Sequence, residues 1–277
     1  MQVVKHVFEY SSRSELPLRL VPVGDIHLGH RNVDFDILEK VLKYIAKTEN
    51  CFFLGMGDYA DSITTKDRRF DFQSLDLNYP TPDKQYRKIR ELFEPIKDKC
   101  LGLLHGNHDY IHWKEHNHNY VDDLAYDLGV PYLTVDAYIR IVFKRKSGGH
   151  AKQRAFDLYA HHGWTGARTI GGRINRITDL ANIFPGLPLY LMGHCHLLGP
   201  IPPRIQLKVN QGLQVVEMKQ NFVFTGSFLR GYVPKAMSYV ESKTYVPTAL
   251  GSPVISIRPL EGKYPFEVKV SLITSET

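Results

Sequence analysis

The stretch Leu103–Asp109, with the sequence LLHGNHD, is an apolar run that stops at a glycine and is followed at once by polar side chains. Gly106 permits a sharp turn where a side chain would obstruct the backbone. Asn107, His108 and Asp109 then present an amide, an imidazole and a carboxylate in succession. The pattern predicts a strand whose carboxyl end carries chemistry. Taken alone it is a weak signal, because Asn, His and Asp are also common turn residues.

Four other apolar runs end in the same way, and this repetition strengthens the prediction of a functional site. They are the runs 18–23, 51–56, 154–160 and 187–192. The polar residues that follow them are Asp25 and His27, then Asp58, then His161 and His162, and finally His194 and His196. In a mostly parallel sheet such strand ends lie along one edge, where α/β proteins place their sites. We therefore expect these groups to converge in space.

The spacing of apolar residues predicts helices between the strands. One helix is expected to begin at Asn32 or Asp34, one at Thr81 with Pro82 in its first turn, and one at Asn119. The last of these should end at Gly129. The run 51–56 is nearly all apolar, as is typical of a strand buried on both faces of a parallel sheet. Repeats of strand, polar turn and helix predict an α/β fold.

The second half of the chain is richer in predicted strands. Runs at 138–143 and 154–160 flank a turn signal, Ser147–Gly149, and should form a hairpin. A helix is expected around 174–181. Five more runs are expected to form strands of a second sheet, at 205–209, 213–218, 222–225, 254–257 and 266–272. Because the sequence shows no linker, repeat or composition break, we expect a single domain over residues 1–277.

Composition favours a soluble, intracellular protein. The chain has 277 residues, 43% of them hydrophobic, and a formal net charge of +6 that favours an anionic partner. No apolar run is long enough to cross a bilayer, and Met1–Ser14 lacks the apolar core of a signal peptide, so we expect a cytoplasmic protein without a membrane partner. Three scattered cysteines favour free thiols over disulfides. Thirteen histidines favour metal binding or acid–base chemistry.

The side chains at the strand ends suit a pair of metal ions. Each motif alone is usually a turn or a surface imidazole, but the whole set is hard to explain without a shared ligand. Carboxylate, imidazole and amide donors suit Mn, Fe, Zn, Co or Ni better than Ca. About seven donors are too many for one tetrahedral ion. Two ions roughly 3.5–4 Å apart with a bridging carboxylate would use them, and such a pair can clamp a phosphoryl group and activate water.

The motifs Asp-x-His, Gly-Asp-x-x-Asp, Gly-Asn-His-Asp, His-Gly and Gly-His-x-His follow one another between Asp25 and His196. In this order they resemble the calcineurin-like metallophosphoesterases, a family of phosphatases, phosphodiesterases and nucleases. The resemblance implies a four-layer α/β/β/α sandwich of two mixed sheets flanked by helices, with the metal site at the strand carboxyl ends. It also implies a metal-dependent phosphoric ester hydrolase whose attacking group is a metal-bridging hydroxide.

The resemblance also assigns roles to individual residues. Two divalent ions, Mn before Fe, Zn, Ni or Co, would be the cofactors. The family's ligand directly precedes the glycine of the His-Gly motif, which favours His162, and strand alternation lets only one of His161 and His162 face the metals. His108 resembles the family's catalytic histidine, which Asp109 or Asp61 would orient. We therefore expect His108 and Asp109 to be catalytic residues. The implied metal ligands are Asp25, His27 and His196 for the first ion, Asp58 as the bridge, and Asn107, His162 and His194 for the second.

Positively charged side chains near the motifs are candidates for substrate phosphates. Arg168 and Arg173 follow the His-Gly motif, as does Arg176, and Arg68 and Arg69 lie in the long loop after Asp58. Guanidinium groups bind phosphate well, although about half of these side chains are as readily explained as ordinary surface charges.

Aromatic residues near the motifs are candidates for base stacking. They are Trp164, Tyr59 and Tyr110, for which packing is the alternative. We therefore expect a phosphodiesterase acting on nucleic acid or nucleotides, resembling the nuclease branch of the family. The alternatives are a phosphomonoesterase or protein phosphatase and, with the donor set complete, less readily a scaffold without catalysis.

Overall fold

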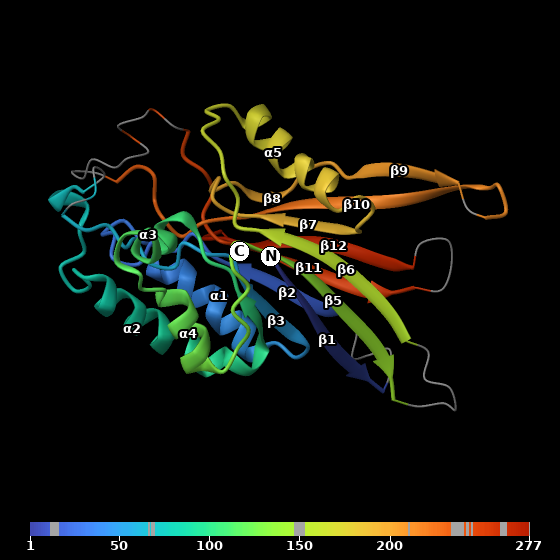
Figure 1. The fold of residues 1–277 in the computed structure, drawn as a ribbon, viewed down its shortest axis with the longest axis horizontal. Helices are drawn as coiled ribbons and strands as arrows, with labels where there is room; N and C mark the ends of the chain where they lie inside the picture. The colour runs from blue at the N-terminus through green and yellow to red at the C-terminus, as the bar shows by residue number, and fades with distance from the viewer. Residues whose placement is uncertain are drawn as a thin grey trace.

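The computed structural model describes residues 1–11, 17–65, 67, 70–146, 153–209, 211–233, 241, 244, 246–260 and 265–276. Two mixed β-sheets pack against each other, and helices cover their outer faces (Figure 1). The α/β/β/α sandwich expected from the sequence is confirmed. In the described part of the chain, no helix is both long enough and apolar enough to cross a membrane. The turn expected at 147–149 lies outside the described residues.

The first sheet has the strand order β12–β11–β2–β3–β4. The neighbouring strands β2, β3 and β4 run parallel, so their carboxyl ends lie at the same edge of the sheet. Strand β11 is antiparallel to β2, and β12 is antiparallel to β11. The strands are β2 (Leu18–Val23), β3 (Cys51–Gly55), β4 (Cys100–Leu103), β11 (Ser252–Pro259) and β12 (Phe266–Ile273).

The second sheet has the order β1–β5–β6–β7–β10–β8, and β9 pairs with β10. Strands β5 and β6 form the antiparallel hairpin expected from the sequence. Strands β6 and β7 run parallel, which brings their carboxyl ends to one edge of this sheet as well. The strands are β1 (Gln2–Tyr10), β5 (Asp136–Arg145), β6 (Gln153–His161), β7 (Leu189–Met192), β8 (Leu198–Pro200), β9 (Arg204–Val209) and β10 (Val215–Thr225).

Two helices on the first sheet begin where the sequence indicates, after Asp34 and Asn119. Helix α1 begins after Asp34, whose carboxylate accepts a hydrogen bond from the backbone N–H of Ile37. Helix α4 begins after Asn119 and ends at Gly129, which adopts the left-handed conformation of a helix C-cap. The bounds are α1 (Phe35–Lys47), α2 (Pro82–Phe93), α3 (Asn107–His116) and α4 (Tyr120–Leu128), with 3-10 helices at Phe72–Ser74 and Glu94–Lys99.

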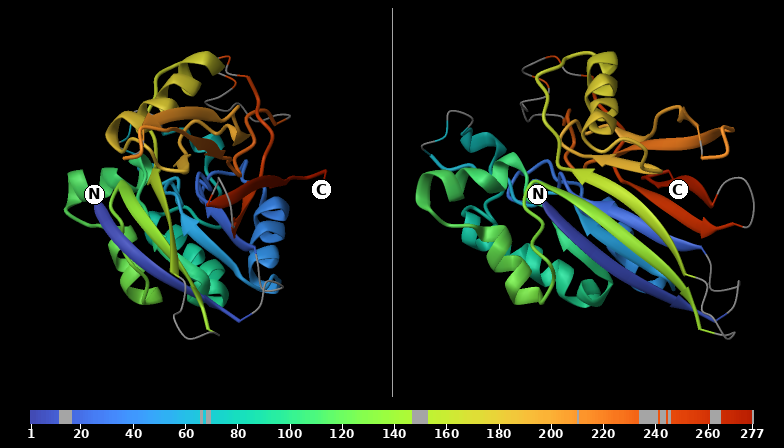
Figure 2. Two further views of the ribbon diagram at one scale, coloured as in Figure 1. Left: turned by 90° about the vertical axis from the view of Figure 1, so that its right-hand side faces the viewer. Right: turned by 45° about the vertical axis from the view of Figure 1, so that its right-hand side comes forward.

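Three apolar layers hold the sandwich together. Side chains of α1, α2 and α4 pack on the outer face of the first sheet, and α5 (Ile170–Ile183) packs on the second sheet. Figure 2 shows α5 on the side of the molecule opposite to the other helices. Between the sheets lie fully buried side chains such as Leu20, Leu54, Leu158 and Leu191. This central layer fixes how the two sheets, and hence their strand ends, sit relative to each other.

Among the elements that were not predicted from the sequence, β1 and α3 are the longest. The first nine residues after Met1 form β1, which pairs in parallel with β5 at the edge of the second sheet. Its exposed positions carry mixed polar and apolar side chains, so it lacks the clean pattern of a buried strand. The segment after Gly106 is helix α3, which has almost no apolar stripe because its first turn carries functional groups.

The strands after His196 were expected to form a second sheet of their own, but they join both sheets. The runs at 213–218 and 222–225 are one strand, β10, which joins β7 and β9 in the second sheet. Strands β11 and β12 instead extend the first sheet through the pairing of β11 with β2. The tail therefore completes both sheets, because β10 pairs with β7 of the second sheet and β11 with β2 of the first.

Candidate metal centre

The first cluster of candidate ligands combines a turn from each sheet. Asp25 and His27 follow β2, and His196 follows β7. His27 Nε2 lies 3.2 Å from His196 Nε2, which lies 3.6 Å from Asp25 Oδ1. One ligand atom from each residue lies within 4.8 Å of the others. The structure thus brings together the three side chains expected to hold the first ion.

The second cluster includes Asp58 and lies beside the first. One ligand atom each from Asp58, His162 and His194 lies within 4.8 Å of the others. His162 Nε2 is 3.4 Å from Asp58 Oδ2 and 3.3 Å from Asn107 Oδ1. Asp58 Oδ2 is also 3.9 Å from His27 Nε2 in the first cluster. Asp58 therefore occupies the position expected of a bridging carboxylate.

These candidate ligands come from two sheets, which corrects the expectation of a single sheet edge. The strands β2, β3 and β4 of the first sheet lead to Asp25, His27, Asp58 and Asn107. The strands β6 and β7 of the second sheet lead to the remaining three histidines. The parallel pairs in both sheets end on the same side of the sandwich, so the clusters form at the junction of the sheets.

The adjacent histidines after β6 have different surroundings. The His162 ring is 1% exposed, and its Nδ1 donates to the backbone oxygen of Met56 at 2.7 Å. That bond leaves Nε2 facing the oxygens of Asp58 and Asn107. The His161 ring turns elsewhere, because its Nδ1 accepts from the Gly163 N–H at 2.8 Å and its ring lies 4.9 Å from that of Trp164. The geometry places His162, rather than His161, in the cluster.

The turns that carry the candidate metal ligands have an unusual backbone conformation. Asp25, His27, Asp58, His194 and His196 all have positive φ angles, between 49° and 62°. Such left-handed non-glycine residues cost about 1–3 kcal/mol each and gather at functional sites. Hydrogen bonds between the turns maintain them, for example from the N–H of Asp25 to the Gly57 oxygen at 2.9 Å and from the N–H of His27 to the Asp58 oxygen at 3.0 Å.

The turn after β4 packs directly against Asp58. A Cβ atom on Gly106 would overlap the Asp58 carboxylate, which explains the glycine at this position. The Asp109 carboxylate accepts from the N–H groups of Asp58 at 2.7 Å and Gly106 at 2.8 Å, and the Tyr86 hydroxyl donates to its other oxygen. Asp109 thus holds two ligand turns together. This favours a positioning role for Asp109 over contact with substrate.

Burial and charge set the protonation of the buried groups. Burial raises the pKa of Asp25 to about 7. Burial alone would also raise the pKa of Asp58, but the adjacent His162 and His108 hold it well below its ordinary value. Burial alone would lower the pKa of His162, yet the carboxylates of Asp58 and Asp25 raise it to about 10. Without a metal ion, the His162 imidazole is therefore in its positively charged form at neutral pH.

The residues fit a pair of divalent ions on the chemistry of the donor set. Asp25 Oδ1 is buried and has no hydrogen-bond partner among the described residues. His162 directs Nε2 at two oxygens of Asp58 and Asn107, an arrangement that requires a cation or a proton between them. Carboxylate, imidazole and amide ligands together match borderline divalent metals. The Nδ1 bond from His162 to a carbonyl is the outer contact that commonly orients a metal-binding histidine.

His108 stands beside the clusters in a fixed orientation. Its Nδ1 donates to the backbone oxygen of Asp61 at 2.7 Å and lies 3.6 Å from the Asp61 carboxylate. Its ring meets that of His27 edge-on at 4.6 Å, and His27, Asp58 and His108 form a third group with ligand atoms within 4.8 Å. Because Nδ1 keeps its proton in the bond to the carbonyl, Nε2 is the ring atom suited to exchange one.

The arginines predicted to bind substrate lie in two different settings. Arg168 is exposed in the segment before α5. Arg173 is half-buried in α5, where its guanidinium donates to the backbone oxygens of Ala167 and Cys195, both at 3.3 Å. Arg173 therefore supports the turn that carries His194 and His196. Arg68 and Arg69 lie outside the described residues.

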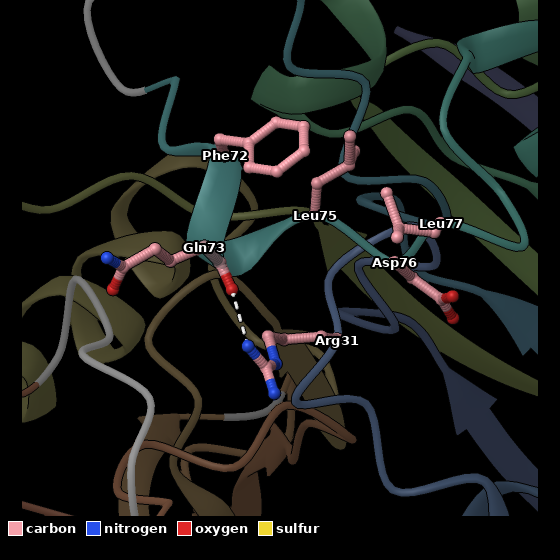
Figure 3. A pocket seen from close by; sticks show the side chains of 6 residues that line it. All are labelled: Arg31, Phe72, Gln73, Leu75, Asp76 and Leu77. Carbon is pink, nitrogen blue, oxygen red and sulfur yellow. Dashed lines mark hydrogen bonds between the residues drawn. The ribbon is translucent and has the colours of Figure 1, made fainter.

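A cavity of about 430 Å³ lies beside the turn after β2 (Figure 3). The loop after β3 forms its wall and is tied to this turn, because the N–H of Asp76 donates to the Gly29 oxygen at 2.8 Å and the N–H of Arg31 to the Ser74 oxygen at 2.8 Å. The cavity is lined by Arg31, Phe72, Gln73, Leu75, Asp76 and Leu77.

Two supporting residues were not identified from the sequence. The Ser227 hydroxyl donates to the backbone oxygen of Asp25 at 2.9 Å and so fixes the first ligand turn from a distant part of the chain. Tyr86 lies on the buried face of α2. Its buried hydroxyl binds Asp109. The need of a buried tyrosine for a polar partner was the available signal for Tyr86, whereas no local pattern marks Ser227.

The chain is similar to several solved structures and matches one family model. No curated protein matches the chain. Among solved structures, a double mutant of Vps29 from Entamoeba histolytica is 12% identical, with 92% of this chain and 98% of that chain covered and a TM-score of 0.38. A metallophosphoesterase from Sphaerobacter thermophilus is 14% identical, with 92% and 88% covered and a TM-score of 0.38. A predicted phosphoesterase from Streptococcus pneumoniae is 13% identical, with 92% and 90% covered and a TM-score of 0.35.

A family model identifies the family of the chain. The model for calcineurin-like phosphoesterases matches residues 18–198, which is more than half of the chain. The matched region contains every candidate metal ligand, from Asp25 to His196. The chain belongs to the calcineurin-like phosphoesterase family.

Proposed function

We propose that the protein is a dinuclear metal-dependent phosphodiesterase that acts on nucleic acid or nucleotides. The observation that carries this proposal is the complete donor set in two clusters that meet at Asp58, whose Oδ2 lies 3.4 Å from His162 Nε2 and 3.9 Å from His27 Nε2. Membership of the family supplies the substrate class, a phosphoester. A chain that served only as a scaffold would have no need to keep a full set of buried, strained ligands.

Each cluster would hold one ion. Asp25, His27 and His196 would hold the first, and Asn107, His162 and His194 the second, with Asp58 shared. Bound Mn ions, or Fe, Zn, Ni or Co in their place, supply Lewis-acid polarisation of the phosphoryl group and activation of water near neutral pH.

The chain's own residues supply positioning and proton transfer. Asp61 holds His108 through the bond from Nδ1 to its backbone oxygen. His108 Nε2 can then deliver a proton to the leaving oxygen of the substrate, a step that typically accelerates a reaction by about 10²–10⁴-fold. Asp109 keeps the turns of Asp58 and Gly106 in register and does not need to touch the substrate.

Access and charge support a diester of nucleic acid or nucleotide type. Asn107 is exposed, and His108, His194 and His196 are partly exposed, so a large substrate can reach the clusters from one side. The net charge of +6 favours a polyanion. Exposed Arg168 lies five residues after Gly163 and can meet a phosphate beside the scissile one.

The proposal is tested by Mn-dependent hydrolysis of an aryl phosphodiester and of the matching aryl phosphomonoester. We expect a higher kcat/KM for the diester, abolished by Asp58→Asn, which keeps the volume of the side chain. The matched control is Asp127→Asn on α4, which removes an exposed carboxylate that pairs with Arg90 of α2. It should leave both rates unchanged.

Each other outcome identifies an alternative. A preference for the monoester would indicate a phosphatase. Absence of hydrolysis with Mn, Ni, Co and Zn would indicate a scaffold. Hydrolysis that survives Asp58→Asn would show that the activity belongs to a contaminant.

A further inference from the structure

Helix α3 presents two aromatic side chains to solvent beside the metal clusters. Tyr110 is 43% exposed and Trp113 is 41% exposed, and their ring centroids lie 5.4 Å apart in an edge-on arrangement. Asn107 precedes Tyr110 by three residues, as Tyr110 precedes Trp113. Residues three apart share a helix face, so a stripe of side chains runs from the candidate ligand Asn107 along the outside of α3.

This aromatic pair is held rigidly from below. The buried His105 ring lies nearly parallel to that of Tyr110, with centroids 5.5 Å apart and 24° between the planes. It meets the Trp113 ring edge-on at 6.1 Å. His105 Nδ1 is in turn 2.6 Å from the Tyr132 hydroxyl. Exposed aromatic side chains that are already ordered lose little conformational entropy when a ligand binds to them.

The position and charge of the stripe suit one class of ligand. Its first member, Asn107, has its side-chain oxygen 3.3 Å from His162 Nε2 in the second cluster. Exposed Lys114 lies one turn beyond Tyr110. Three residues of helix rise by about 4.5 Å, which is comparable to the rise of about 3.4 Å per nucleotide in each strand of duplex DNA. Aromatic faces combined with a positive charge are the features that bind single-stranded nucleic acid without sequence preference.

We propose that Tyr110 and Trp113 form a base-stacking ledge for a single-stranded nucleic acid whose scissile phosphate lies at the Asn107 end. The bases next to that phosphate would stack on the two rings, while Lys114 contacts the backbone. The position of the scissile phosphate rests on the proposed phosphodiesterase function. Binding of bases to the ledge is a separate property and can be measured without hydrolysis.

Binding is measured with fluorescein-labelled hexathymidylate and an abasic oligomer of the same length, in the presence of Mn. The background is His108→Gln, which keeps the seven side chains expected to bind the two ions and slows cleavage. We expect Trp113→Ala to raise the Kd for hexathymidylate by about 10-fold, in line with the loss of one stacked base. Trp113→Phe should restore most of the affinity. The matched control is Tyr126→Ala on α4, where a tyrosine is 87% exposed, and it should leave the Kd unchanged.

A second measurement is independent of any loss of folding in the alanine variant. The chain has two tryptophans, so Trp164→Phe leaves Trp113 as the single indole fluorophore. Hexathymidylate should quench its fluorescence, whereas the abasic oligomer should not. Absence of quenching, equal affinity for the two oligomers, or an unchanged Kd in Trp113→Ala would each overturn the ledge.

The ledge and the proposed function fail in different ways. If hexathymidylate binds through Trp113 but no diester is hydrolysed, the ledge stands and the phosphodiesterase function is wrong. If oligonucleotides are hydrolysed and Trp113→Ala leaves their KM unchanged, the function stands and the ledge is wrong. The ratio of kcat/KM for hexathymidylate to that for the aryl diester should fall by about 10-fold in Trp113→Ala if both are correct.

Discussion

The two carboxylate oxygens of Asp58 contact different groups. Oδ1 accepts from the backbone N–H of His108 at 2.8 Å, and so joins β3 to the start of α3. Oδ2 lies between His27 and His162, at 3.9 Å and 3.4 Å from their Nε2 atoms. Its own N–H is bound by Asp109. One buried residue thus connects both clusters to the helix that carries His108.

His108→Gln should separate proton transfer from metal binding. The amide cannot deliver a proton, so we expect kcat for the aryl diester to fall by about 10²–10⁴-fold while the metal content stays at the wild-type level. Steady-state kinetics and elemental analysis of the same samples measure both quantities. The control is His116→Gln, an exposed histidine on the same helix. Loss of metal from His108→Gln would make it a ligand, and an unchanged kcat would remove it from catalysis.

The affinity for Mn should rise with pH. In the metal-free protein, burial would lower the pKa of His162, but the neighbouring Asp58 and Asp25 carboxylates raise it to about 10. This pKa lies above the ordinary value for histidine, so His162 is positively charged at every pH below about 10. A metal ion that binds to its ring must therefore displace a proton. We expect the affinity to increase by up to about tenfold per pH unit between roughly pH 6 and 8. Isothermal titration calorimetry across this range would refute the account if the affinity were constant or fell.

At the scale of elements, the Tyr86–Asp109 contact ties α2 to the turns after β3 and β4. Tyr86→Phe removes the hydroxyl that donates to the buried Asp109 carboxylate. We expect a loss of about 1.5–3 kcal/mol in the free energy of unfolding, the usual range for a hydrogen bond to a charged group. The neighbouring Tyr120 offers a matched control, because its hydroxyl donates to Asp83 at the surface. Urea denaturation showing equal losses in Tyr86→Phe and Tyr120→Phe would contradict the buried tie.

Elements with local signals could be predicted from the sequence. Helix α4 has its cap at Asn119 and its stop at Gly129, and both work as the residue types suggest. Helix α3 could not be predicted, because Asn107 and Asp109 serve the site and leave no apolar stripe. Strand β1 has an exposed face at the sheet edge and lacks the pattern of a buried strand. Where function or exposure determines the residue type, the secondary-structure signal weakens.

At the scale of the whole molecule, the clusters depend on how two sheets pack. The first sheet supplies Asp25, His27, Asp58 and Asn107, and the second supplies His162, His194 and His196. The motifs identified all of these side chains from the sequence. Their distribution over two sheets was missed, because strand pairing between distant segments, such as β11 with β2, leaves no local trace.

Leu191→Ala should weaken the layer that joins the sheets. Leu191 lies on β7, is fully buried between the sheets, and precedes the turn of His194 and His196 by a few residues. We expect a loss of about 2–5 kcal/mol in the free energy of unfolding. Leu207→Ala on β9, where the side chain is 64% exposed, should change it by no more than about 0.5 kcal/mol. A single transition in urea would support the single domain expected over residues 1–277, whereas two transitions would divide it.

The stoichiometry of Mn binding tests the dinuclear centre most directly. Isothermal titration calorimetry with elemental analysis should give two ions per chain for the wild type and for His161→Gln, because the His161 ring lies outside the clusters. His162→Gln removes a candidate ligand of the second cluster and should leave one tightly bound ion. One ion in the wild type, or loss of an ion from His161→Gln but not from His162→Gln, would contradict the centre described above.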